Sequence, residues 1–312
     1  MKLAFLFPGQ GSQKVGMVHD LYEKYDSVKA LIKEADETLG FSISKMMFEG
    51  PDEDLMKTEF TQPAILTASV AVCRVLNDNG LKADIAAGHS LGEYSALVAA
   101  GAMSFADAVH TVHLRGKFMQ EAVPLGEGGM AAVIGLDPEK IAEVLKGVST
   151  EEAPVEAVNF NCPGQTVIAG ATKAVEKACA ALKEAGARRA VILKVSAPFH
   201  STLMKPAALK LKEVLDKITI HDTVIPVVAN VNAKEETKAD EIRANLVAQA
   251  DHPVHWDESI RAMIAGGVDQ TVEVGPGTVL SGFMRKIDRS VPSAHAEDIV
   301  TIASVLEELK GV

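Results

Sequence analysis

The 312-residue sequence has little of several features that mark broad classes of protein. Aromatic residues make up 4% of it, and the formal net charge is −11 because 42 Asp and Glu outnumber 31 Lys and Arg. Nucleic-acid and anionic-membrane surfaces are bound by clustered cations, so this balance argues against both as partners. The three cysteines, Cys73, Cys162 and Cys179, contain no CxxC pair, and they predict neither a disulfide framework nor a cysteine-rich zinc site.

Long hydrophobic runs are also missing. No apolar stretch approaches the roughly 18 residues that predict a membrane span. The run from Leu3 to Phe7, which Pro8 and Gly9 follow, is too short for the apolar core of a signal peptide. We therefore expect a cytoplasmic protein with no membrane partner.

The sequence does contain a regular alternation of short apolar runs and longer amphipathic stretches. Near-continuous apolar strands joined through helices are typical of a parallel sheet covered on both faces, so the predicted class is α/β. The length predicts about two domains. The runs interpreted as strands are LAFLF, ADIAAG, GMAAVIG, TVIAG, AVILKV, VIPVVAN and TVEVG.

One region, residues 126–194, has a different order of elements. Its pattern is strand, helix, strand, strand, helix, strand, which is the βαββαβ order of a ferredoxin-like unit. We predict an inserted ferredoxin-like subdomain at 126–194 and a large, hydrolase-like α/β domain formed by residues 1–125 and 195–312. The expected crossing points are 126–129 and 196–198.

The strongest local motif is Gly88-His89-Ser90-Leu91-Gly92, a G-x-S-x-G sequence between an apolar strand and a helical run that extends to about Ala100. The flanking glycines permit a tight turn that lifts the serine hydroxyl above the sheet at a helix N-terminus. We interpret Ser90 as a nucleophile, with an ordinary Gly-Ser turn as the alternative.

A serine nucleophile needs a base, and nine histidines compete for that role. His200 stands out because it follows the apolar run AVILKV, and ligand groups collect at the carboxyl ends of strands in α/β sheets. His89 is adjacent to the serine, and the turn should direct its side chain elsewhere. No aspartate is set apart by its context, so the acid of a Ser-His-Asp triad has no sequence signal.

Two further features carry open alternatives. The turn from Phe7 to Gln13 has Lys14 where a dinucleotide fingerprint needs glycine; it is either a simple loop or a source of N–H donors for an oxyanion. Arg115 lies in the mostly apolar helical stretch from Phe105 to Val123. It is either a snorkelling residue or, if it faces the serine, a ligand for a substrate carboxylate. Met119 is most simply a core residue.

Taken in chain order, these segments closely resemble the malonyl-CoA:acyl-carrier-protein transacylases, the acyltransferase family of bacterial fatty-acid synthesis. The resemblance covers essentially the whole chain, and the inserted ferredoxin-like subdomain also belongs to that family. The segments that carry it are Phe7 to Gln13, Gly88-His89-Ser90-Leu91-Gly92-Glu93, Arg115, Asn159-Phe160-Asn161, Phe199-His200-Ser201, Gln249 and Val274-Gly275-Pro276-Gly277.

The resemblance implies transfer of a malonyl group from malonyl-CoA to the phosphopantetheine thiol of acyl carrier protein, through a malonyl ester of Ser90. His200 would be the base, the main-chain carbonyl of Gln249 would orient it, and Arg115 would pair with the malonyl carboxylate. The backbone N–H groups of Gln10 and Leu91 would hold the oxyanion. The further substrate-binding residues that it implies are Gln10, His89, Met119, Asn159, Asn161 and Phe199, the last of which would crowd the α-methyl of methylmalonyl.

The resemblance also implies a monomer with no metal and no bound cofactor, whose partner is acyl carrier protein. Carrier proteins are usually acidic, as this chain is, so docking would need a local basic face. Candidate faces are Arg188 with Arg189 and Lys194, or Arg285 with Lys286. Three alternatives stay open: a loading acyltransferase of polyketide synthesis, a serine hydrolase or thioesterase, and a non-catalytic protein that keeps the fold.

Overall fold

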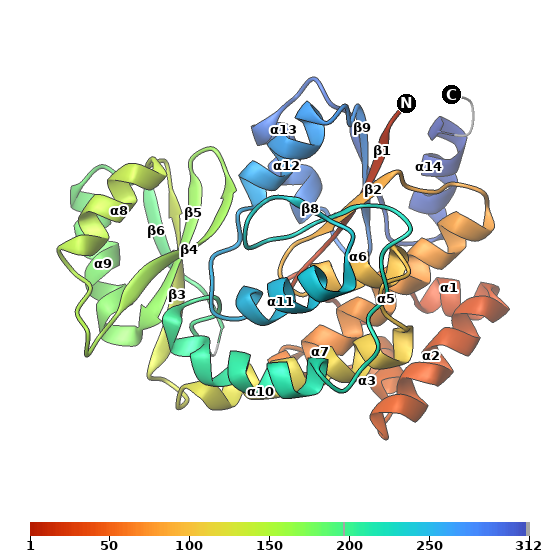
Figure 1. The fold of residues 1–312 in the computed structure, drawn as a ribbon, viewed down its shortest axis with the longest axis horizontal. Helices are drawn as coiled ribbons and strands as arrows, with labels where there is room; N and C mark the ends of the chain where they lie inside the picture. Colours follow the sequence, from red (N-terminus) through yellow and green to blue (C-terminus); the bar gives the residue numbers. More distant parts are fainter. Residues whose placement is uncertain (196, 310–312) are drawn as a thin grey trace.

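The computed structural model describes residues 1–195 and 197–309, and these residues form two sheets with helices around them (Figure 1). The larger sheet has six strands in the order β10-β9-β1-β2-β7-β8. Its strands are β1 (Leu3–Phe7), β2 (Ile85–Gly88), β7 (Val227–Val228), β8 (Glu235–Glu236), β9 (Gln270–Val274) and β10 (Ser293–Ala296).

The larger sheet is mainly parallel, as the apolar runs predicted. Strands β10, β9, β1, β2 and β7 pair in parallel, whereas β8 pairs antiparallel with β7 and forms an edge. The expected strand VIPVVAN was too long: β7 covers only Val227–Val228, since Pro226 has no N–H for a ladder bond. The sequence analysis missed β8 and β10, which are short and lack the apolar pattern of the other strands.

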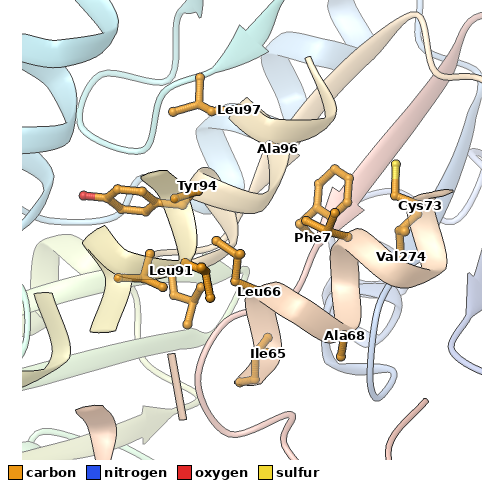
Figure 2. Close-up of a cluster of buried hydrophobic side chains, with 14 of the residues drawn as sticks. Phe7, Ile65, Leu66, Ala68, Cys73, Leu91, Tyr94, Ala96, Leu97 and Val274 are labelled. Carbon is orange, nitrogen blue, oxygen red and sulfur yellow. The ribbon is translucent and has the colours of Figure 1, made fainter. Parts of the chain in front are cut away.

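Both faces of the larger sheet are buried. Successive side chains of β1 point to opposite faces, so they contribute to two separate cores. Leu3, Phe5 and Phe7 belong to the main core, whereas Ala4 and Leu6 belong to a second core on the other face. Figure 2 shows part of the main core, which includes Phe7, Leu66, Leu91 and Tyr94. The helices that supply these two cores include α5 (Thr58–Asp78), α6 (Gly92–Ala99) and α7 (Phe105–Ala122) on the first face, and α12 (Trp256–Ala265) and α13 (Val279–Ile287) on the second.

The remaining helices of this part of the molecule pack around that frame. Helices α10 and α11 contact each other, and α10 also packs on α7. Their bounds are α1 (His19–Lys24), α2 (Asp26–Leu39), α3 (Ile43–Glu49), α4 (Asp52–Leu55), the 3-10 helix η1 (Thr202–Met204), α10 (Lys205–Leu215), α11 (Ala239–Gln249) and α14 (Ile299–Leu309).

The smaller sheet lies to one side of the larger one (Figure 1) and has its own hydrophobic core. Its strand order is β4-β5-β3-β6, and each adjacent pair is antiparallel. Two helices cover it. The elements are β3 (Gly128–Ile134), α8 (Pro138–Lys146), β4 (Val155–Cys162), β5 (Gln165–Ala171), α9 (Thr172–Glu184) and β6 (Arg189–Ile192).

The second expected crossing point falls partly on Ser196, which lies outside the described residues, and the domain boundaries at 126 and 194 stay a prediction. The smaller sheet is tied to the rest of the chain through β4. The N–H of Val254 donates to the carbonyl of Val158 at 2.8 Å, and the N–H of Phe160 donates to the carbonyl of Val254 at 2.9 Å. Within the described ranges, no helix has the length and apolarity that crossing a bilayer requires.

Candidate active site

Ser90 lies in the turn between β2 and α6, and close packing of the backbone fixes this turn. A Cβ added to Gly88 would meet the carbonyl carbon of Gly92 at 1.9 Å, and one added to Gly92 would meet the carbonyl oxygen of Phe7 at 2.1 Å. Ser90 itself has φ +52°, a left-handed conformation that is rare for residues other than glycine and is associated with functional sites. The G-x-S-x-G spacing therefore holds the serine hydroxyl at the strand edge.

His200 is hydrogen-bonded on both ring nitrogens. Its Nε2 lies 2.7 Å from Oγ of Ser90, and its Nδ1 lies 2.7 Å from the main-chain carbonyl oxygen of Gln249. Because a carbonyl can only accept, Nδ1 carries the proton, which leaves the Nε2 lone pair free to accept the serine O–H. Burial, and next the charge of Arg115, lower the pKa of His200 to about 3, so the ring is neutral and available as a base.

The reason given for selecting His200 from the sequence was wrong. The strand expected at AVILKV ends at Ile192, and it belongs to the antiparallel smaller sheet rather than to the parallel one. His200 therefore does not lie at the carboxyl end of a strand of the larger sheet. It lies in a turn just before η1 and has φ +63°, a second left-handed residue at the site.

Arg115 is 2% exposed and lies on α7 with its guanidinium facing the serine. One terminal nitrogen donates to Oε1 of Gln62 at 2.8 Å; the other donates to Oε1 of Gln249 at 2.8 Å and to Oγ of Ser90 at 3.2 Å. Among the described residues, no carboxylate is hydrogen-bonded to it. Burial lowers its pKa, but guanidinium groups stay charged in proteins. The cavity thus presents a cation with no carboxylate partner beside the nucleophile, and Arg115 faces the serine, as the second of its two alternatives required; the role of carboxylate ligand stays a prediction.

The backbone N–H groups near the nucleophile differ in their partners. The N–H of Ser90 donates to Oδ1 of Asn230 at 2.7 Å and is occupied. Within residues 1–195 and 197–309, the N–H groups of Gln10 and Leu91 donate to no acceptor. Free N–H donors beside a nucleophile are the groups that stabilise an oxyanion.

A chain of side chains links Gln10 to the arginine. Oγ1 of Thr58 donates to Oε1 of Gln10 at 2.9 Å and accepts from Nε2 of Gln62 at 3.1 Å, and Gln62 accepts from Arg115. Because each amide has a charged or hydroxyl partner at one end, the orientation of both glutamine side chains is determined.

These residues surround a cavity of about 420 Å³. Most of the predicted site residues line it, and three do not. Gln249 and Met119 lie behind its wall, where Sδ of Met119 accepts from Nε2 of Gln62 at 3.8 Å. Asn161 lines a neighbouring cavity of about 250 Å³ together with Asn159. The predicted residues that line the main cavity are Gln10, His89, Ser90, Leu91, Arg115, Asn159, Phe199 and His200.

His89 points away from the nucleophile, as the turn predicted. Its Nε2 lies 2.8 Å from Oδ1 of Asn161 on β4, and burial lowers its pKa. The contact joins the nucleophile turn to the smaller sheet, so these two residues connect the two halves of the cavity wall.

Sequence analysis missed Asn230 and Gln62. Asn230 is buried; besides holding the Ser90 N–H, it donates to the carbonyl of Gly88 at 2.8 Å. Its position at the end of the run VIPVVAN was a usable signal, since a polar residue after an apolar strand lies at the ligand-binding edge. Gln62 had no such signal because it lies within a long buried helix.

Cysteine and metal chemistry are not arranged at this site. The three cysteines are free and buried, and burial raises the pKa of the Cys73 thiol to about 12. The described residues contain no group of three or more His, Cys, Asp or Glu side chains placed to hold a metal ion.

Comparison with known proteins extends over nearly the whole chain. Residues 4–306 match the acyl transferase domain family. The chain is 52% identical over 309 residues to the malonyl CoA-acyl carrier protein transacylase of Bacillus subtilis, covering 99% of this chain and 98% of that protein. It is 51% identical over 307 residues to the protein of the same name from Escherichia coli, covering 98% and 99%.

Solved structures give the same result. A malonyl-transacylase in complex with its type II polyketide synthase acyl-carrier protein has a TM-score of 0.96 and 47% identity, covering 99% of this chain and all of that one. An acyl carrier protein S-malonyltransferase from Vibrio cholerae has a TM-score of 0.95 and 46% identity, covering 98% and 100%.

Proposed function

This chain belongs to the malonyl-CoA:acyl-carrier-protein transacylases of the acyl transferase family, and we propose that it transfers the malonyl group of malonyl-CoA to the phosphopantetheine thiol of acyl carrier protein. Such a transfer supplies chain elongation in fatty-acid synthesis. The observation that carries the proposal for this chain is the buried guanidinium of Arg115, 3.2 Å from Oγ of Ser90.

Arg115 gives the choice of acyl group a physical basis. In a malonyl thioester, one methylene separates the reacting carbonyl from a carboxylate, so a cation close to the nucleophile is within reach of that carboxylate. A planar guanidinium binds a carboxylate through two parallel N–H bonds. An acetyl group would leave this buried cation without an anion, which is the situation that produces strong discrimination.

In the first half-reaction, Oγ of Ser90 attacks the thioester carbonyl carbon as Nε2 of His200 takes its proton. The tetrahedral oxyanion accepts hydrogen bonds from the backbone N–H groups of Gln10 and Leu91. The carbon–sulfur bond then breaks, coenzyme A takes the proton from His200, and malonyl-Ser90 remains.

In the second half-reaction, the carrier's thiol gives its proton to His200 and attacks the ester. The Ser90 oxygen leaves and regains the proton. The carbonyl of Gln249, 2.7 Å from Nδ1 of His200, takes the place of a triad carboxylate as the group that orients the ring. Among the lining residues, Phe199 is proposed to crowd an α-methyl substituent, and His89, Asn159 and Asn161 to shape the wall around the acyl group. Met119 would act only through Gln62.

The proposed reaction needs no metal or redox cofactor, because a thioester is already an activated acyl group and no electron is transferred. The three free, buried cysteines fit a reducing compartment, and we propose the cytoplasm.

Intact-protein mass spectrometry tests the proposal directly. After brief incubation with malonyl-CoA, we expect one malonyl adduct that maps to Ser90, disappears when acyl carrier protein is added, and is absent with acetyl-CoA. The Ser90→Ala variant is the matched control and should carry no adduct. Release of free malonate without an adduct would favour the serine hydrolase, and neither adduct nor turnover would contradict an enzymatic role.

A second candidate carrier has one specific observation in its favour. The structure with 47% identity is a malonyl-transacylase bound to a type II polyketide synthase carrier. The chemistry at Ser90 is the same for both carriers, so competition between a fatty-acid and a polyketide carrier for malonyl-Ser90 would distinguish them through relative kcat/KM.

For carrier docking we propose one of two basic faces, Arg188 with Arg189 and Lys194, or Arg285 with Lys286. Lys194 lines the main cavity, and Arg188 and Arg189 are exposed at the other end of β6. Arg285 and Lys286 are exposed on α13. Charge reversal at the face that binds the carrier should lower kcat/KM for the carrier while leaving acylation by malonyl-CoA alone unchanged; unchanged carrier kinetics for both groups would contradict the proposal.

A further inference from the structure

Glu93 is a buried carboxyl group next to the site that the reaction above does not use. It lies in the first turn of α6, three residues after Ser90, and is 0% exposed. Its Oε2 accepts two hydrogen bonds, from the N–H of Asn230 and from Nε2 of Gln249, both at 3.0 Å. Its Oε1 has no partner among the described residues. All of its hydrogen bonds therefore go to residues that contact the nucleophile or its base.

Gln249, one of these partners, contacts the side chains of His200 and Arg115 and the main chain of Ser90. Its main-chain carbonyl accepts from His200, and its side-chain Oε1 accepts from Arg115 at 2.8 Å. Its Nε2 donates to the carbonyl of Ser90 at 2.7 Å as well as to Glu93. The amide is thus fixed at its oxygen end by a cation and at its nitrogen end by the Ser90 carbonyl and a carboxyl oxygen. Loss of the carboxyl oxygen would leave one N–H of the amide without its acceptor and weaken the hold on the side chain.

Asn230, the other partner of Glu93, forms hydrogen bonds with the main chain of the nucleophile turn. Its side chain accepts from the N–H of Ser90 at 2.7 Å and donates to the carbonyl of Gly88 at 2.8 Å. Since Glu93 holds the backbone of Asn230, one carboxyl oxygen connects the nucleophile turn to the histidine orienter.

We infer that Glu93 is a positioning residue for this acyl transfer: Oε2 fixes the side chain of Gln249 and the backbone of Asn230, and through them the carbonyl that orients His200 and the peptide of Ser90. This inference deepens the proposed function and rests on it. It assigns Glu93 no contact with substrate.

The role requires an acceptor at one position rather than a negative charge. Burial, and next the charge of Glu236, raise the pKa of Glu93 to about 8, so the neutral acid is well populated near pH 7. Protonation on Oε1 leaves Oε2 able to accept both N–H donors. Glutamine at position 93 can present an oxygen in the same place, aspartate would withdraw it by one methylene, and alanine would remove it.

The test measures sulfonylation of Ser90 by phenylmethanesulfonyl fluoride. In that reaction Oγ bonds to sulfur, fluoride leaves, and His200 takes the proton, so the rate reports on Ser90 and His200 without malonyl binding. We expect Glu93→Ala and Glu93→Asp to react at least about 30-fold more slowly than the unaltered protein, and Glu93→Gln to recover to within about fivefold. Acylation by malonyl-CoA should fall by a similar or larger factor, through kcat rather than KM.

Glu273→Ala is the matched control. Glu273 is also 0% exposed and accepts two backbone N–H bonds, from Leu280 and Ser281, but it contacts neither Ser90 nor Gln249. Its loss should lower the Tm while the sulfonylation rate per folded molecule stays within about threefold. The rates are compared on protein that circular dichroism shows to be folded. If Glu93→Ala does not fold, the comparison is made with Glu93→Asp.

Two results would overturn the inference. One is sulfonylation of folded Glu93→Ala or Glu93→Asp within about threefold of the unaltered protein. The other is a loss in Glu93→Gln equal to that in Glu93→Asp, which would show that an acceptor oxygen at this position is not enough for the role. If malonyl-CoA failed to label the unaltered protein while sulfonylation proceeded, the proposed function would be contradicted. The sulfonylation rates of the Glu93 variants would still test whether Glu93 positions Ser90 and His200.

Discussion

At the scale of single residues, Arg115 is the group on which the proposed selectivity depends. It is buried, holds neutral acceptors and lies against Ser90. A cation in that position stabilises an anion that arrives with the substrate. It also favours the neutral form of His200, which keeps the base deprotonated.

Replacing Arg115 should therefore change which acyl group is accepted. We expect Arg115→Ala to lower kcat/KM for malonyl-CoA by about 10³-fold or more, and Arg115→Lys to recover only part of it, because lysine cannot form the planar pair. The rate with acetyl-CoA should change much less. Stopped-flow acylation with both thioesters measures the ratio, and an unchanged malonyl-to-acetyl ratio in Arg115→Ala would contradict the proposed role.

The lowered pKa of His200 gives a second prediction. Burial lowers the pKa of His200 in the free enzyme to about 3. The rate of Ser90 sulfonylation should therefore stay nearly constant from pH 8 down to about pH 5, and the pH–rate profile should show no fall near the ordinary histidine pKa of about 6.5. Arg115→Met removes the neighbouring positive charge and so favours the imidazolium form of His200. In this variant the pH at which the sulfonylation rate falls should move up towards about 6.5. A fall in the sulfonylation rate near about pH 6.5 in the unaltered protein would show that His200 is not desolvated.

At the scale of elements, the β2–α6 turn was the part best predicted from sequence. Its requirement is local: glycine at 88 and 92, and a strand and helix on either side. Arg115 was located on its helix, but the face that it presents depends on packing, so its role stayed open. His200 was selected for its place after a strand that lies in the other sheet, and a main-chain orienter such as the Gln249 carbonyl has no residue signature at all; only the resemblance implied it.

The same turn gives a prediction about stability. In Gly92→Ala the new methyl group would lie 2.1 Å from the carbonyl oxygen of Phe7, so β1 and α6 must separate. We expect a destabilisation of about 2–4 kcal/mol and a sulfonylation rate at least tenfold lower. Gly282→Ala on α13 is the control, because its Cβ would meet no atom within 4 Å. Equal Tm values for the two variants would contradict this account of the motif.

At the scale of the whole molecule, buried carboxyl groups should make stability depend on pH. Burial is the main cause that raises the pKa of Glu93 to about 8 and of Glu236 to about 7. A raised pKa means that the folded chain binds more protons than the unfolded chain from about pH 4.5 up to the folded pKa, so this stability is complete below about pH 4.5 and is lost as pH rises to 7 to 8.

His200 acts in the opposite direction and at lower pH. Its pKa is lowered, so its contribution is complete above about pH 6.5 and declines as pH falls towards 3. Urea unfolding at pH 6 and 8.5 should therefore show a lower free energy at the higher pH. Glu236→Gln should reduce that difference by on the order of 1 kcal/mol. A Glu236→Gln protein with the same pH dependence as the unaltered chain would show that this carboxyl group ionises normally.

The active site is assembled from distant parts of the chain: Ser90 contacts a residue 110 positions away, and Arg115 one 134 positions away. Catalytic competence is therefore a late event in folding, because contacts between residues far apart in sequence must wait for the loops between them to close. During refolding from urea, helical circular dichroism should recover before Ser90 regains its reactivity. The sulfonylation rate would then report when the native topology is complete. Spectroscopic probes of local structure do not report that step.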